Sequence, residues 1–432
     1  MRNNKTLTYL HNIRMAGFPI GLGLTSVLVG GTLNRVMIVE LEMPASLVGF
    51  FFALPLLVSP ARIWLGYRSD SHPLLGLRRE PYIVAGSLIA ALGVSGIAFS
   101  TLNLSSTLAM IGVTLFAFIA YGLGKNLSSN TFEALLADKF EGEARPRAVT
   151  FFKVAMFLGI IGGAIGLGKM LDPFSVEKFI SIVVGVVIVA FFLSTFASLW
   201  QEPRTEEMRE ASEEAGAVSF VETFKIMVWA DPQVRLFFIF VMLTVVGTLA
   251  QDVLLEPYGA LVLNMSVGET TILTAIWGAG TVLSMMIAGA WMIKKFGYAP
   301  VLRAGLLLGI IVFAGIITAG AIENISLFLG LVFALGICTG LSAAGMLTAV
   351  IEFTTAARAG LLMGVWGVAH ELGQAFGSLM SGTIVDIGRA LTNDNALIAY
   401  STVFALEAIL LALALVLEKK IDLSQSKIMA ER

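Results

Sequence analysis

The sequence contains few charged residues and almost no cysteine. Aspartate, glutamate, lysine and arginine make up 13% of its 432 residues, and Cys338 is the only cysteine, which excludes an internal disulfide framework. The formal net charge of −2 and the lack of a long basic tract give no indication of nucleic-acid binding. Phosphate-binding glycine loops, metal-ligand clusters and a nucleophile beside its base are also missing. We therefore expect no catalytic residues, no metal site and no enzymatic activity.

Apolar residues dominate the composition. They form 57% of the chain, and the mean hydropathy is +0.87, which is typical of an integral membrane protein. A helix needs about twenty apolar residues to cross a bilayer, and continuous apolar runs without two-residue alternation favour helices over a β-barrel. The sequence predicts an all-α protein with twelve transmembrane helices, at 15–38, 46–66, 82–101, 107–127, 148–170, 177–199, 233–255, 270–292, 300–319, 325–350, 359–385 and 396–417.

The basic residues fall mostly in alternate connections between these spans. With both termini in the cytoplasm, 22 of the 28 lysines and arginines lie in or beside cytoplasmic segments, and this bias sets the orientation of membrane proteins. The outer loops then carry only Arg35, Lys169, Lys178 and Arg389. We predict a multi-pass protein in the lipid bilayer with both termini cytoplasmic.

One long hydrophilic connection divides the chain. Residues 201–231 are rich in glutamate and arginine and have little apolar surface to bury, so they predict a cytoplasmic linker. The linker separates an N-terminal six-helix half, 1–200, from a C-terminal six-helix half, 232–432.

The two halves share spaced sequence matches. The segment 31–33, Gly-Thr-Leu, recurs at 247–249, and at the same offset Glu40 matches Glu256. Two parallel six-helix repeats are the arrangement of the major facilitator fold, which we therefore predict. The polar residues at these repeat-related outer helix ends are candidate site residues: Asn34, Arg35, Glu40, Gln251, Asp252 and Glu256.

A short charged loop connects the second and third predicted spans. Its glycine, aspartate and arginine pair resemble the signature of the loop between helices 2 and 3 in the major facilitator superfamily. There the glycine permits close helix approach, and the carboxylate holds an arginine or a helix N-terminus in one of two rocking conformations. We predict a conformational gating loop, and a basic loop that only sets orientation is the alternative. The candidate residues are Gly66, Arg68, Asp70, Arg78 and Arg79.

The deeply placed polar residues are His370, Glu371 and Gln374, a candidate pigment or proton site in the span 359–385. His370 should lie near the bilayer centre, since it follows Arg358 by about twelve residues at about 1.5 Å each. A neutral imidazole can coordinate the magnesium of a chlorin or relay protons, and a buried hydrogen bond between helices is the alternative. Glu371 is rotated by about 100° from His370, so it faces either a cavity or a neighbouring helix.

Three segments carry a resemblance that is narrower than the superfamily. They are LNRVMIVEL at 33–41, GYRSD followed by RREPY within 66–82, and QDVLLEPYG at 251–259. Together they resemble the PucC-type family, the bacteriochlorophyll delivery group, and the similarity extends over essentially the whole chain. Members are associated with the assembly of light-harvesting antenna complexes in photosynthetic bacteria.

This resemblance implies an assembly factor for light-harvesting antenna complexes. Its expected location is the bacterial inner membrane, which means either the cytoplasmic membrane or the intracytoplasmic photosynthetic membrane. The resemblance also implies (bacterio)chlorophyll as the carried pigment, and antenna polypeptides and pigment-synthesis enzymes as partners. Two other hypotheses stay open. One is a proton-coupled secondary transporter of a small solute with Glu371 as its proton site, and the other is a pigment-free scaffold for antenna assembly.

Overall fold

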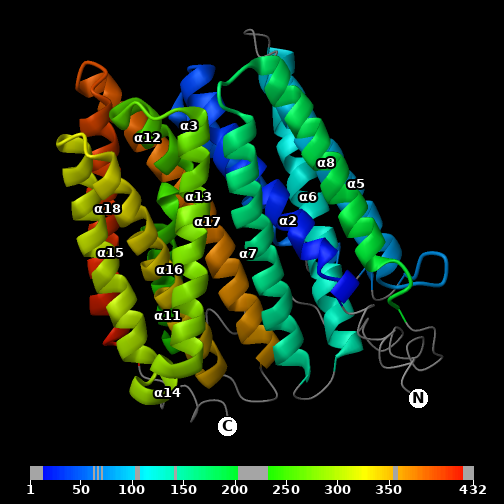
Figure 1. The fold of residues 1–432 in the computed structure, drawn as a ribbon. Coiled ribbons are helices and arrows are strands. Elements are labelled where there is room, and N and C mark those ends of the chain that lie inside the picture. The colour runs from blue at the N-terminus through cyan, green and yellow to red at the C-terminus, as the bar shows by residue number, and fades with distance from the viewer. Residues whose placement is uncertain are drawn as a thin grey trace. The chain divides into compact units, whose positions relative to one another are not determined.

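The structure is a computed structural model that describes residues 13–61, 64–65, 68–69, 72–102, 108–140, 144–202, 232–353 and 359–421. Within these ranges the chain is helical apart from short connections, and the only strand-like pairing is an isolated bridge between Leu74 and Leu77 (Figure 1). The predicted all-α class is confirmed.

Each of the twelve predicted spans contains a described helix, although α3 (Ala45–Leu57) ends well before the predicted end of the span 46–66. Ten of the described helices are long and apolar enough to cross a membrane. The two exceptions have different causes. Helix α3 is apolar but has only 13 residues. Helix α17 (Ala359–Leu391) has 33 residues, but polar side chains such as His370 and Glu371 lower its hydropathy.

The chain forms two compact units. Unit 1 comprises Met1–Leu33 and Val58–Val218, and unit 2 comprises Asn34–Leu57 and Ser219–Arg432. The segment Asn34–Leu57 therefore makes its contacts mainly with the C-terminal part of the chain.

Unit 1 is built around close helix contacts at glycine. A Cβ atom on Gly124 would lie 2.3 Å from the Ala90 backbone nitrogen, and one on Gly23 would lie 2.3 Å from the Met156 carbonyl oxygen. Only glycine permits backbones to approach this closely. The helices of this unit are α2 (Gly17–Val27), η1 (Leu28–Leu33), α5 (Glu80–Leu102), α6 (Leu108–Lys139), α7 (Ala144–Met170) and α8 (Val176–Ser198).

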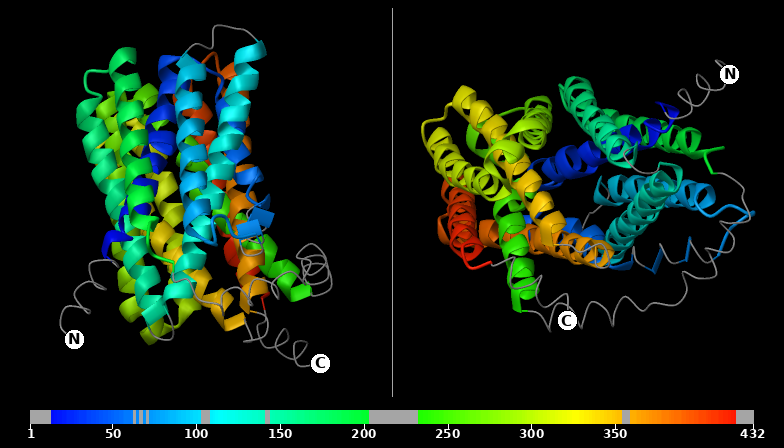
Figure 2. Two further views of the ribbon diagram at one scale, coloured as in Figure 1. Left: turned by 90° about the vertical axis from the view of Figure 1, so that its right-hand side faces the viewer. Right: turned by 90° about the horizontal axis from the view of Figure 1, so that it is seen from below.

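Unit 2 contains the remaining described helices, and the right-hand view of Figure 2 shows several of them end-on. An aromatic core holds them together, in which Tyr258 meets Phe404 edge-on with ring centroids 5.1 Å apart. The helices are η2 (Val36–Glu40), α3, α11 (Pro232–Leu249), η4 (Ala250–Val253), α12 (Leu255–Leu263), α13 (Val267–Ile287), η5 (Ala288–Met292), α14 (Ile293–Phe296), α15 (Tyr298–Ala321), α16 (Ile325–Phe353), α17 and α18 (Ala396–Glu418).

The two repeat-related helices are both irregular near the segments that match in sequence. In the first half, two π-helical turns, η1 and η2, occupy Leu28–Leu33 and Val36–Glu40. In the second half, the predicted span 233–255 is interrupted by the 3₁₀ turn η4, and α12 continues after it. Such departures from α-helical geometry leave backbone groups unpaired within the helix and are frequent at functional sites.

Candidate functional site

Eight polar residues of unit 2 gather around the helix interruption at η4, and we refer to them as the polar site. Each comes from a segment that packs near η4 or α12. They are Asn34, Arg35, Gln251, Asp252, Glu256, Thr274, Gln374 and Glu407.

Asn34 is hydrogen-bonded to the interrupted helix. It is fully buried, and its Nδ2 donates to the Val253 carbonyl oxygen at 2.7 Å and more weakly to that of Asp252 at 3.4 Å. A helix interruption frees backbone carbonyl groups, and a buried carbonyl needs a donor. The side-chain amide of Asn34 therefore satisfies the backbone that the 3₁₀ turn exposes.

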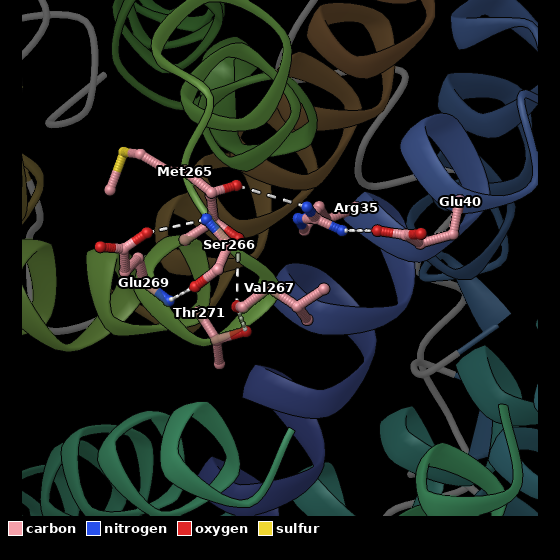
Figure 3. A network of polar contacts seen from close by, with 8 residues as sticks. Arg35, Glu40, Met265, Ser266, Val267, Glu269 and Thr271 are labelled. Carbon is pink, nitrogen blue, oxygen red and sulfur yellow. Dashed lines mark hydrogen bonds and ion pairs between the residues drawn. The ribbon is translucent and has the colours of Figure 1, made fainter. Parts of the chain in front are cut away.

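Arg35 connects the turn η2 to the residue that precedes the capped start of α13 (Figure 3). Only 4% of Arg35 is exposed, and its guanidinium group forms an ion pair with Glu40 and donates to the Met265 carbonyl oxygen at 3.5 Å. Directly after Met265, Ser266 and Glu269 form a capping box at the N-terminus of α13. Arg35 thus contacts the residue that precedes a well-capped helix.

Glu256 and Gln251 are buried and only partly hydrogen-bonded. Glu256 Oε1 accepts from the Thr274 hydroxyl at 2.9 Å, and Gln251 Nε2 donates to the Thr248 carbonyl oxygen at 2.7 Å. Glu256 Oε2 and Gln251 Oε1 have no partner among the described residues. Each of these two oxygens could accept a hydrogen bond from a proton donor or a ligand.

Glu407 of α18 is the most isolated carboxyl group of the polar site. It is fully buried, and neither carboxylate oxygen has a hydrogen-bond partner of normal geometry in the described part of the chain. Its polar neighbours are the backbone of Gln251 and the carboxyl group of Asp252. An unpaired charge is costly to bury, so a carboxyl group in this position can hold a proton.

The structure brings one of the three deep residues of α17 into the polar site. The side chain of Gln374 is hydrogen-bonded to Asp252, whose side chain is exposed. His370 and Glu371 are half-buried, and the His370 ring lies beside the Trp366 indole with the ring centroids 5.5 Å apart. The Trp366 Nε1–H group is buried without a partner among the described residues.

The predicted gating loop is partly described. Gly66 and Asp70 lie outside the described residues. The carbonyl oxygen of Arg68 accepts from the backbone N–H of His72 at 3.0 Å. Arg79 is 4% exposed, and its guanidinium group donates to the Asp138 carboxylate at 2.8 Å and to the Ser69 hydroxyl at 3.1 Å.

Family resemblance covers most of the chain. The family model "PUCC protein" matches residues 32–426. The chain belongs to the PucC family. Protein PucC of Cereibacter sphaeroides is 32% identical over 419 residues, which cover 94% of this chain and 90% of the relative. The "Bacteriochlorophyll synthase 44.5 kDa chain" of Rhodobacter capsulatus is 30% identical over 424 residues, which cover 95% of this chain and 94% of the relative.

Solved structures show which fold this PucC-family protein has. A point mutant of the nucleoside transporter NupG superposes with a TM-score of 0.76 at 13% identity, covering 95% of this chain and 100% of the transporter. At this identity the likeness shows the fold alone, and it confirms the predicted major facilitator fold. Family and fold together point to a membrane protein of transport or assembly rather than an enzyme, although one relative carries the name of a synthase chain.

Two residues of the polar site in this PucC-family chain, Thr274 and Glu407, are not among the candidates that the sequence offered. Thr274 has no distinguishing sequence context. Glu407 has one, because it is the only charged residue between positions 396 and 417. A lone carboxyl group in an apolar span is a functional-site signal. The site therefore extends beyond the residues that the repeat marks.

Proposed function

We propose that this protein is a membrane assembly factor for photosynthetic light-harvesting antenna complexes and that it binds (bacterio)chlorophyll and delivers it to antenna polypeptides. The observation that carries the proposal is the relationship over 95% of the chain to a protein named for bacteriochlorophyll synthesis. The PucC proteins related over a similar length support the same photosynthetic context. The expected location is the inner membrane of a photosynthetic bacterium, with both termini in the cytoplasm.

The pair His370 and Trp366 is the feature of the described chain that fits a chlorin. An imidazole nitrogen can coordinate the central magnesium, and an indole ring can pack against the macrocycle. The Trp366 Nε1–H group has no partner in the described chain, so it is available to a carbonyl group on the pigment. In this proposal His370 holds the pigment and Trp366 orients it.

The test is an absorption spectrum of the protein purified in mild detergent from a host that makes the pigment. We expect stoichiometric chlorin in the parent, its loss in His370→Leu and a shifted or weaker band in Trp366→Phe. His72→Leu is the matched control, because it removes another imidazole far along the sequence. Equal pigment in all variants would exclude His370 as the ligand. A colourless parent that retains antenna polypeptides would support the pigment-free scaffold.

Proton-coupled transport of a small solute is the second candidate. The observation that favours it is that two buried carboxyl groups, Glu256 and Glu407, have oxygens without a hydrogen-bond partner among the described residues. Glu371 remains the proton site that the sequence predicts for this candidate. Solute flux into proteoliposomes that depends on a pH gradient, and that Glu407→Gln abolishes, would support this candidate over pigment delivery.

A further inference from the structure

A groove lies on the surface of unit 1, between two helices that both pack on a third. Helices α7 and α8 each pack on α2 (Figure 1), and Leu24 of α2 lines the space between them. The groove has a volume of about 660 Å³, within the range of about 300–1,000 Å³ typical of small-molecule sites. Its lining is mostly apolar and includes Leu167, Ile182 and Val189.

The glycines of α7 and α8 differ in their surroundings, and only some of them permit close helix packing. A Cβ atom on Gly159 would lie 2.4 Å from the Ile20 carbonyl oxygen, so this glycine permits close contact with α2. A Cβ atom on Gly162, Gly166 or Gly185 would meet nothing within 4 Å, and all three residues line the groove. Larger side chains would fit at these three positions, and they would occupy the groove.

Two lysines lie at one end of the groove. Among the described residues, Lys169 and Lys178 are the only charged ones that line it, whereas Asp172 and Glu177 of the same connection do not. The Lys178 ammonium group donates to the backbone carbonyl oxygens of Asp172 and Pro173, both at 3.4 Å, so these two contacts are long. Neither lysine forms an ion pair with a carboxylate of the described chain.

The lack of an ion-pair partner among the described residues distinguishes these two lysines from the other basic residues that the sequence predicts on the outer side. Arg35 has Glu40 as its ion-pair partner, and Arg389 has Asp394. The two lysines, which lack an ion-pair partner among the described residues, therefore lie at one end of a mostly apolar groove. A groove that is apolar along its length and basic at one end is complementary to an anionic lipid. Basic sites between membrane helices attract anionic lipid headgroups.

We propose that this groove binds an anionic phospholipid, with an acyl chain along Gly162, Gly166 and Gly185 and the phosphate between Lys169 and Lys178. Each buried methylene contributes about 0.8 kcal/mol whatever the headgroup, so the acyl chain gives affinity and the two lysines give selectivity. The site shares no residue with His370 or the polar site, and its occupation does not depend on pigment binding.

The experiment is native mass spectrometry of the full chain in detergent, titrated with phosphatidylglycerol or with phosphatidylcholine of the same acyl chains. We expect the parent to bind phosphatidylglycerol more tightly. The double variant Lys169→Gln/Lys178→Gln should bind phosphatidylglycerol about tenfold more weakly and phosphatidylcholine unchanged. Gly166→Leu should bind both lipids weakly, because it fills the groove.

Two control variants separate these effects from general damage. Lys419→Gln/Lys420→Gln removes the same charge from the exposed end of α18, and Gly112→Leu adds the same side chain at an exposed, open position of α6. Both should bind lipid as the parent does. Equal affinity of the parent for the two lipids, or an unchanged preference in the double lysine variant, would overturn the proposal. So would an antenna polypeptide that occupies the groove of the parent and is lost in Gly166→Leu, since the groove would then be a helix-docking surface.

Discussion

Glu80 and Glu202 each accept hydrogen bonds from the backbone of the segment that carries the other. The Glu80 carboxylate accepts from the N–H groups of Trp200, Gln201 and Glu202 at 2.7–2.9 Å. The Glu202 carboxylate accepts from the N–H groups of Arg78 and Arg79 at 2.7 and 2.8 Å. This exchange joins the start of α5 to the segment that follows α8, and the guanidinium group of Arg79 also donates to Asp138.

Removing one carboxylate from this exchange should destabilise unit 1. Glu80 is 5% exposed, so Glu80→Ala leaves three N–H groups without their acceptor, and hydrogen bonds to charged groups contribute about 1.5–3 kcal/mol each. Of the three donor residues only Gln201 is buried, so water can replace part of what the others lose. We therefore expect Glu80→Ala to lower the free energy of unfolding by about 2–4 kcal/mol and Glu80→Gln by less, since its amide oxygen can still accept. Thermal unfolding in detergent measures both.

The control for this prediction is an exposed carboxylate. Glu133 lies 4.0 Å from the Lys153 ammonium group, and the two side chains are 56% and 59% exposed. Exposed ion pairs contribute about 0–1 kcal/mol, so Glu133→Ala should leave the unfolding temperature close to that of the parent. Equal losses of thermal stability in Glu80→Ala and Glu133→Ala would show that the hydrogen bonds between Glu80 and Glu202 stabilise unit 1 no more than an exposed ion pair does.

Asp386 should anchor α3 to α17 within unit 2. Its carboxylate oxygens accept from the N–H groups of Ala45 and Ser46 at 2.9 and 2.8 Å, at the N-terminus of α3. A carboxylate there satisfies unpaired donors and interacts favourably with the helix dipole. Asp386→Ala should cost about 1–2 kcal/mol of stability, measured by denaturant unfolding, and Asp386→Asn should cost less. A loss as large in the asparagine variant would mean that the carboxylate charge, rather than the acceptor, stabilises this contact.

The fold is largely predictable from the sequence because it follows from hydropathy and repeats. The bilayer requires long apolar helices, so the spans could be located from composition alone. The helix interruption at Ala250–Val253 could not be predicted in this way, because the local sequence around Gln251 and Asp252 is compatible with a continuous helix. Asn34 stabilises that interruption from more than two hundred residues away.

The polar site shows where repeat alignment stops being informative. Glu40 and Glu256 match in the alignment, but Glu40 is ion-paired with Arg35, whereas Glu256 is buried and accepts from Thr274. The repeat alignment predicts that Glu40 and Glu256 lie at equivalent positions of two helices. It does not predict their different environments, which depend on the packing of unit 2. The contact of Gln374 with Asp252 likewise depends on tertiary packing, which no local pattern encodes.

The contact between α3 and α17 should not tolerate a side chain at Gly382. A Cβ atom there would lie 2.2 Å from the Ala45 carbonyl oxygen, closer than any real Cβ contact. Gly382→Ala should therefore lower the free energy of unfolding by about 1–3 kcal/mol through overpacking. Gly330→Ala is the matched control, because its Cβ atom would meet nothing within 4 Å and alanine favours a helix by about 0.5–1 kcal/mol. Thermal unfolding of the two variants should move in opposite directions, and parallel shifts would contradict the packing argument.

Glu407 should tolerate neutralisation better than truncation. Its carboxyl group is buried without a hydrogen-bond partner of normal geometry among the described residues, so Glu407→Gln keeps the volume and removes any charge. We expect Glu407→Gln to change the free energy of unfolding by less than about 1 kcal/mol, and Glu407→Ala to lower it by about 2 kcal/mol or more because it opens a cavity. Denaturant unfolding of both variants in one detergent makes the comparison. A large loss in Glu407→Gln would show that the folded protein holds a charged Glu407 with a bound cation or proton donor, and the polar site would then be an ion site rather than a proton site.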